Sequence, residues 1–269
     1  MIRTRTATLA AGAVGAMLML GTTPALAADT ATVSILHAVP NTPVDVYANG
    51  QELIPNFQPG TLTDPMPLPA GTYDLAIYPA GSDPASTQPA AKADDVSVPA
   101  GANATVVAHL DASGTPVITP FVNDTSPVPA GQARVVVRHT AAAPAVDVRA
   151  GGTPVIQGLT NPDEKALTVP AGTVSADVVL AGTDTVAIGP ADLSLAEGAT
   201  TIVYAWGSQD AGFQLAVQTI SGPSSAPSGM PAGSGGQAGD GLPLPLAGTA
   251  LAGLVAAALA GRRLLATRA

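Results

Sequence analysis

The chain carries the same motif twice, and this duplication limits the folds available to it. The first copy, from His37 to Gly50, reads HAVPNTPVDVYANG, and the second, from His139 to Gly152, reads HTAAAPAVDVRAGG. The histidines, aspartates and final glycines of the two copies each lie 102 positions apart, so the copies align without a gap. A duplication with this spacing predicts two similar domains in tandem, each of viable size for independent folding.

The similarity continues beyond the motif and predicts an all-β fold. Pro-Ala-Gly-Thr at 69–72 returns at 170–173, now 101 positions later. Short runs rich in Val, Ile and Thr alternate with turns of Pro, Gly, Asn and Asp, as expected of strands. We therefore expect about seven strands per copy and two tandem immunoglobulin-like antiparallel β-sandwich domains. A compact barrel built by both copies together is the alternative.

The two ends of the chain predict a protein held at the cell envelope. Residues 1–27 have the basic start, apolar stretch and small-residue cleavage site of a secretory signal peptide. Residues 242–269 form an apolar segment with a basic tail, which predicts a C-terminal anchor with the body outside the cell. The expected organisation between these ends is a first sandwich at 29–125, a second at 133–222, and a Gly/Ser/Pro-rich stalk at 223–241.

The distribution of charge excludes one class of partner. Five of the ten basic residues lie in the terminal segments, and all nineteen acidic residues lie between them, which leaves the exported body with a formal charge of −14. Such a surface repels polyanions, so we expect no nucleic-acid partner. The chain has no cysteine, so its stability must come from packed cores rather than disulfides.

Four polar residues repeat with the motif and are the candidate site residues. Val33 and Ile35 alternate in phase with the first histidine, so both histidines should face the core, while the aspartates fall on the opposite face or at the hairpin mouth. One interpretation makes each His–Asp pair an acid–base or metal site. The favoured interpretation is structural: the imidazole caps turn carbonyls and the carboxylate accepts backbone amides. The four residues are His37, Asp45, His139 and Asp147.

Other signatures of catalysis are missing from the sequence. It has no Gly-x-Ser-x-Gly, no His-Glu-x-x-His and no phosphate-binding Gly-x-x-x-x-Gly-Lys motif. Asp94-Asp95 and Asp163-Glu164 lack the alternating oxygen ligands of a calcium loop. His109, the third histidine, aligns with Trp206 of the second copy, which indicates packing. We expect no enzymatic activity, no metal and no cofactor.

The C-terminal segment resembles a sortase sorting signal, in which a transpeptidase cuts before the glycine and joins the protein to the cell wall. The matching residues are Leu244, Pro245, Leu246, Ala247 and Gly248, followed by an apolar run and two arginines. The usual pattern has Thr where this chain has Ala247. A retained membrane anchor is the alternative interpretation.

The repeated motif as a whole resembles the bacterial family of domains of unknown function numbered 4397. The resemblance rests on a strand ending in His, the Val-Asp-Val-x-Ala-x-Gly segment and the later Pro-Ala-Gly-Thr, and covers both copies. It implies an exported, surface-associated, all-β protein without an assigned reaction.

Two functions follow as expectations. The first is a non-enzymatic surface protein that presents two sandwich domains for structural or adhesive contacts, with the membrane, peptidoglycan or another protein or glycan as partner. The second is an extracellular binding module for a glycan, small ligand or divalent metal at the paired His–Asp loops.

Overall fold

The computed structural model describes residues 30–221, and every regular element among them is a β-strand. The all-β prediction is therefore confirmed for this part of the chain. The signal peptide, stalk, anchor and sorting motif predicted at 1–27 and 223–269 lie outside it. Within residues 30–221 no helix is long and apolar enough to cross a membrane.

Each repeat contributes eight strands, one more than the sequence pattern predicts. The first repeat contains β1 (Thr30–Ala38), β2 (Val44–Ala48), β3 (Gln51–Phe57), β4 (Met66–Pro69), β5 (Gly71–Pro79), β6 (Ala91–Val98), β7 (Asn103–Leu110) and β8 (Pro116–Val122). The second contains β9 (Gln132–Ala142), β10 (Val146–Ala150), β11 (Thr153–Leu159), β12 (Glu164–Pro170), β13 (Gly172–Leu180), β14 (Val186–Leu195), β15 (Ala199–Ser208) and β16 (Gly212–Ser221).

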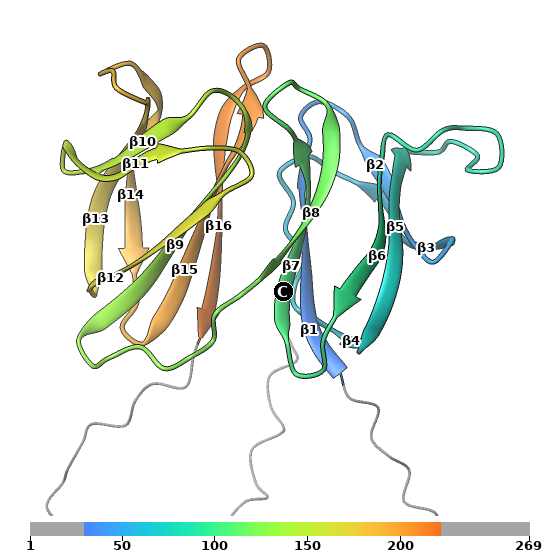
Figure 1. The fold of residues 1–269 in the computed structure, drawn as a ribbon, viewed down its shortest axis with the longest axis horizontal. Coiled ribbons are helices and arrows are strands. Elements are labelled where there is room, and N and C mark those ends of the chain that lie inside the picture. The colour runs from blue at the N-terminus through green and yellow to red at the C-terminus, as the bar shows by residue number, and fades with distance from the viewer. Residues whose placement is uncertain (1–29, 222–269) are drawn as a thin grey trace, which may run out of the picture. The chain divides into compact units, whose positions relative to one another are not determined.

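The strands of each repeat form two four-stranded sheets that pack as a sandwich (Figure 1). The first sandwich has the sheet orders β4-β1-β7-β8 and β3-β2-β5-β6, and the second repeats them as β12-β9-β15-β16 and β11-β10-β13-β14. In each sandwich one central pair is parallel, β1 with β7 and β9 with β15. The other pairs within these sheets are antiparallel.

This strand order departs from the immunoglobulin-like arrangement that we expected. In an immunoglobulin domain the first two strands share a sheet. Here β1 and β2 lie in opposite sheets, and β1 instead pairs with β7. The segment between β1 and β2, residues 39–43, therefore passes from one sheet to the other.

Tight turns fix the first hairpin of each repeat. Asn49 and Gly50 join β2 to β3 with φ values of 50° and 75°, and Gly151 and Gly152 join β10 to β11 with 54° and 79°. Two consecutive residues with positive φ are the geometry of the two-residue hairpin turn that matches the twist of the strands. The glycines at the end of the repeated motif are therefore explained by backbone conformation.

The core of each sandwich lies between its two sheets. Alternate residues of β1 and β7 pack on those of β2 and β5 in the first repeat, and β9 packs on β10 and β13 in the second. The innermost residues of the first core are Ile35, Val44, Val46, Phe57, Ile77 and Ala108; those of the second are Val135, Val137, Val146, Val148, Ile156, Leu159 and Val178.

A third apolar cluster joins the two sandwiches to each other. Leu36, Val107 and Phe121 come from the first repeat, and Ile202 and Trp206 from the second. Together with Val136 of β9, these side chains lie on the faces of β1, β7, β8, β9 and β15 that point away from the sandwich cores, so the central strands are buried on both sides. Both sandwiches consequently belong to one compact unit.

Candidate functional site

His37 and His139 take the same place in the two sandwiches, at the turn that crosses between the sheets. The Nε2 of His37 donates to the carbonyl of Thr42 at 2.8 Å, and that of His139 donates to the carbonyl of Pro144 at 3.0 Å. In each ring Nδ1 accepts the backbone N–H two residues further along the chain at 3.4 Å. Since a carbonyl oxygen can only accept, both rings are neutral with the proton on Nε2.

Burial keeps these rings uncharged. His37 is 0 % exposed and His139 is 1 % exposed. Loss of hydration lowers the pKa of both imidazoles below its usual value, and the hydrogen bond to the turn carbonyl opposes this only in part. Both histidines are buried, in agreement with the prediction that they face the core. The ring of His37 also stacks on that of Phe57.

Asp45 joins two separate backbone segments of the first sandwich. Its Oδ1 accepts the N–H of Asn56 at 2.7 Å and its Oδ2 accepts the N–H of Gly81 at 2.7 Å. Asn56 lies in β3, where the register with β2 shifts, and has a φ of 48°. Such a bulge leaves an amide without a partner in the ladder, and the carboxylate supplies one.

Asp147 repeats this arrangement in the second sandwich. Its two oxygens accept the N–H groups of Gly158 and Gly182 at 2.7 and 3.0 Å. These two hydrogen bonds, with that from Gly182 the stronger influence, lower the pKa of the Asp147 carboxyl. Asp147 thus connects the bulge in β11 to the turn after β13, just as Asp45 connects the bulge in β3 to the turn after β5.

Neither sandwich contains a His–Asp couple. No hydrogen bond joins His37 to Asp45 or His139 to Asp147, and every nitrogen and oxygen of the four side chains has a backbone partner. These are the contacts that the structural interpretation expects. The repeated residues thus use their side-chain nitrogens and oxygens to bind the protein's own backbone.

His109 is a packing residue on β7, close to the second sandwich. Its Nδ1 donates to the carbonyl of Leu110 and its Nε2 contacts the Thr119 hydroxyl, both at 2.9 Å. Burial lowers its pKa, and the nearby His139 adds to this effect. The carbonyl of Leu110 also receives a hydrogen bond from Asn161 of the second repeat at 2.8 Å. The residue therefore belongs to the contact between the sandwiches.

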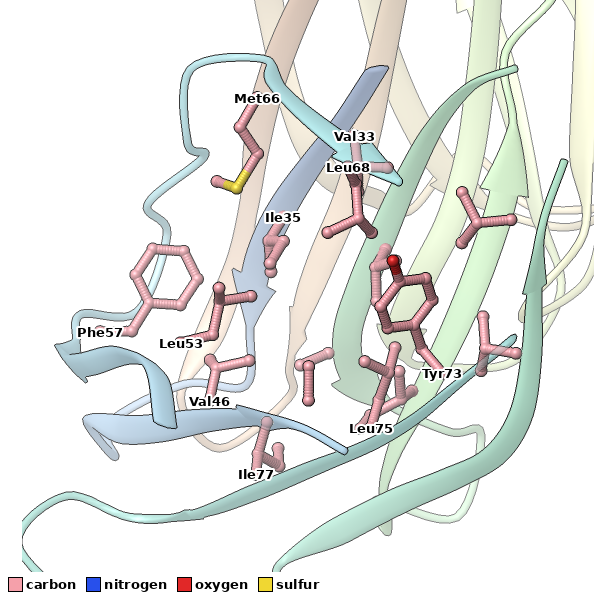
Figure 2. A pocket seen from close by; sticks show the side chains of 16 residues that line it. Val33, Ile35, Val46, Leu53, Phe57, Met66, Leu68, Tyr73, Leu75 and Ile77 are labelled. Atoms are coloured by element: carbon pink, nitrogen blue, oxygen red, sulfur yellow. The ribbon is translucent and has the colours of Figure 1, made fainter. Parts of the chain in front are cut away.

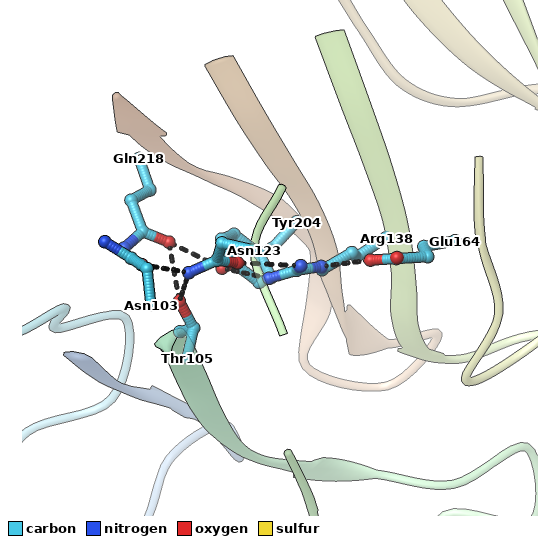
Figure 3. A network of polar contacts seen from close by, with 7 residues as sticks. All are labelled: Asn103, Thr105, Asn123, Arg138, Glu164, Tyr204 and Gln218. Carbon is cyan, nitrogen blue, oxygen red and sulfur yellow. Dashed lines mark hydrogen bonds and ion pairs between the residues drawn. The ribbon is translucent and has the colours of Figure 1, made fainter. Parts of the chain in front are cut away.

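A polar network that the sequence analysis missed crosses the same contact (Figure 3). Arg138, 1 % exposed at its side chain, donates to Glu164 at 2.7 Å, to the Tyr204 hydroxyl at 2.8 Å and to Asn123 at 2.9 Å. Its guanidinium also lies 4.3 Å from the ring centre of Phe121. The charge is thereby paired, and each of the three guanidinium nitrogens donates a hydrogen bond, which offsets the cost of burying an arginine.

The network continues from the tyrosine to the first sandwich. The Tyr204 hydroxyl donates to Gln218 at 2.7 Å, and Gln218 accepts from Thr105 of β7 at 3.0 Å. Asn123 donates to the Thr105 hydroxyl at 3.0 Å. The motif offered no signal for this network, because Arg138 occupies the position of Leu36 in the first copy.

Two tyrosines form a groove on the outer face of the β3-β2-β5-β6 sheet. The rings of Tyr47 and Tyr78 meet edge to face with centroids 5.2 Å apart. The groove encloses about 180 Å³, and Lys92 and Asp94, paired at 2.8 Å, lie on its wall. The second repeat has Arg149 in place of Tyr47, so this groove is not duplicated.

Three of the acidic residues considered for metal binding form ion pairs or hydrogen bonds with other side chains. Asp94 pairs with Lys92, Glu164 with Arg138, and Asp163 accepts from the Thr160 hydroxyl. Among residues 30–221 no three His, Cys, Asp or Glu side chains converge closely enough to hold a metal ion.

The comparison with protein families bears on the first repeat. Residues 31–149 match the family model described as Domain of unknown function (DUF4397). The DUF4397 match runs from β1 to β10, so it includes both copies of the His–Asp motif and the whole of the first sandwich. It supports the family resemblance over these residues. A comparison with curated proteins found no match.

Proposed function

We propose that the chain is a non-enzymatic protein of the cell envelope that presents two β-sandwich domains for structural or adhesive contacts. One observation carries this proposal: the histidine and aspartate of the repeated motif bind backbone groups in the same way in both sandwiches. A duplicated feature used in this way preserves a scaffold. The negative charge of the body is consistent with it.

We also propose that the two sandwiches are tandem copies of one domain. The matching sheet orders and the matching hydrogen bonds of Asp45 and Asp147 support this, although the family match ends at residue 149. The export signal at 1–27 and the anchor at 242–269, with its sortase-like Leu244–Gly248 segment, are proposed from the sequence alone.

The test is a binding assay with isolated peptidoglycan and membrane fractions. We expect saturable retention of the purified protein on one of them, and the same retention for the His37→Gln/His139→Gln variant at a temperature where circular dichroism shows it folded. Equal retention is expected because both rings are buried and their nitrogens hydrogen-bond to the protein's own backbone. Loss of retention by a folded variant would assign the histidines to a site and contradict the scaffold interpretation.

The groove of Tyr47 and Tyr78 favours a second function, the binding of a glycan. Two aromatic faces beside a Lys–Asp pair offer both apolar contact for a sugar ring and polar groups for its hydroxyls. Soluble wall glycan fragments titrated against the Tyr47→Ser/Tyr78→Ser variant test this function. The control is Tyr73→Phe, which removes a tyrosine hydroxyl bound to the carbonyl of Pro69 rather than one in the groove. Equal affinity for the wild type and the double serine variant would exclude the groove.

A further inference from the structure

The second sandwich contains an apolar cavity of about 150 Å³ between its sheets. Its lining surface is entirely apolar, and Arg149 contributes only the stem of a side chain whose guanidinium binds Asp177 at 2.6 and 2.8 Å. Protein interiors contain few voids larger than a water molecule, so a cavity of this size needs an explanation. A dry cavity of about this volume in another protein binds benzene or xenon.

The first sandwich has the same cavity at the same place, but it is nearly filled. Its volume is about 40 Å³, and Figure 2 shows Tyr73 and Leu75 among the side chains around it. The equivalent residues in the second repeat are Val174 and Ala176, 101 positions later, and both line the larger cavity. The difference in volume thus follows from smaller side chains on β13 than on β5. The first repeat also shows that this fold can fill the space.

Both cavities reach the surface beside an edge strand. Leu53 on β3 and Val155 on β11 are 102 positions apart, line the two cavities, and are 40 % and 44 % exposed. These two are among the few large apolar side chains that the described residues leave exposed. An apolar residue held at the mouth of an apolar cavity in both repeats marks an entrance.

We propose that the second sandwich binds the end of a hydrocarbon chain, such as the tail of a fatty acid, in this cavity. The apolar lining offers no hydrogen bond to a head group, so the polar end of the ligand stays outside the mouth at Val155. The volume admits only a short length of chain, because it matches cavities that take a molecule the size of benzene. This site is separate from the scaffold role and from the tyrosine groove.

The experiment titrates the full chain with decanoate and follows binding by isothermal titration calorimetry. We expect one saturable site in the wild type. The Ala176→Leu variant places in the second repeat the residue that the first repeat carries, and it should weaken binding by about tenfold or more because the chain can no longer enter. Its melting temperature should stay the same or rise.

The reverse variant, Leu75→Ala, should open the first cavity and add a second site per chain. Absence of saturable binding in the wild type, or undiminished binding by folded Ala176→Leu, would overturn the proposal. Binding of benzene, seen by ligand-detected NMR, without binding of decanoate would overturn the choice of a hydrocarbon chain. The milder Ala176→Val variant gives the same comparison should Ala176→Leu not fold.

Discussion

Acid should destabilise this protein well above the pH range in which its carboxylates titrate. His37, His109 and His139 are all buried, and burial lowers the pKa of each ring in the folded state. The unfolded chain has an ordinary imidazole pKa of about 6.5, so below that pH it binds protons that the folded chain does not. Stability is therefore complete above about pH 6.5 and falls as the pH decreases below it.

The magnitude follows from the number of rings. With all three neutral in the folded protein, lowering the pH from 7.5 to 5.0 costs up to about 2 kcal/mol for each histidine, or about 6 kcal/mol in total. That loss is comparable to the whole stability of many domains. With a urea m-value of about 2 kcal/mol/M, the urea concentration at the midpoint of unfolding should be lower at pH 5.0 than at pH 7.5 by up to about 3 M.

Trp206 provides the assay, because it is the single tryptophan and is 3 % exposed. Urea unfolding followed by its fluorescence at the two pH values gives the change in free energy. The His37→Gln variant serves as the control: it should be less stable at pH 7.5 but should lose only about two-thirds as much stability on acidification. A midpoint that does not change between pH 7.5 and 5.0 would refute the assignment of three buried neutral rings.

Three further predictions concern single residues and use the same urea assay. Arg138→Met should cost about 2–3 kcal/mol, because Asn123 and Tyr204 lose a buried partner while the half-exposed Glu164 can be hydrated; an unchanged midpoint would contradict this. Asp45→Asn should cost about 1.5–3 kcal/mol, and more than Asp147→Asn, since Asp45 is the more buried of the two and an amide nitrogen cannot accept. Gly207→Ala should prevent folding, because the added Cβ would lie 2.2 Å from the backbone oxygen of Gly212. Gly81→Ala meets open space and should cost only about 1–2 kcal/mol, since its φ of 76° is unfavourable for alanine. Equal effects of the two variants on stability would contradict this reasoning.

The local features of the fold could be predicted from the sequence. Alternation in Val33, Ile35 and His37 indicated the inward face of β1, because this pattern depends on neighbouring residues only. The same holds for the aspartates, whose affinity for backbone amides is a property of the side chain.

The parallel pairing of β1 with β7 could not be obtained in this way, since periodicity indicates which face of a strand is buried but not its partner. The contact between the sandwiches did leave a signal. Val135–Val137 and Ile202–Trp206 are runs without polar alternation, which is typical of strands buried on both faces. The cavity was beyond prediction, because its volume depends on how Val174 and Ala176 face side chains from five other strands.

The parallel pair at the centre of each sandwich also governs how the chain reaches its fold. Thr32 pairs with Asn103 and Ala38 with His109, so the central ladder of the first sandwich joins residues about seventy positions apart in sequence. Closing so long a loop costs entropy before the ladder forms, which makes for slow folding. A chain synthesised from its N-terminus cannot complete either sandwich until the seventh strand of that repeat has emerged.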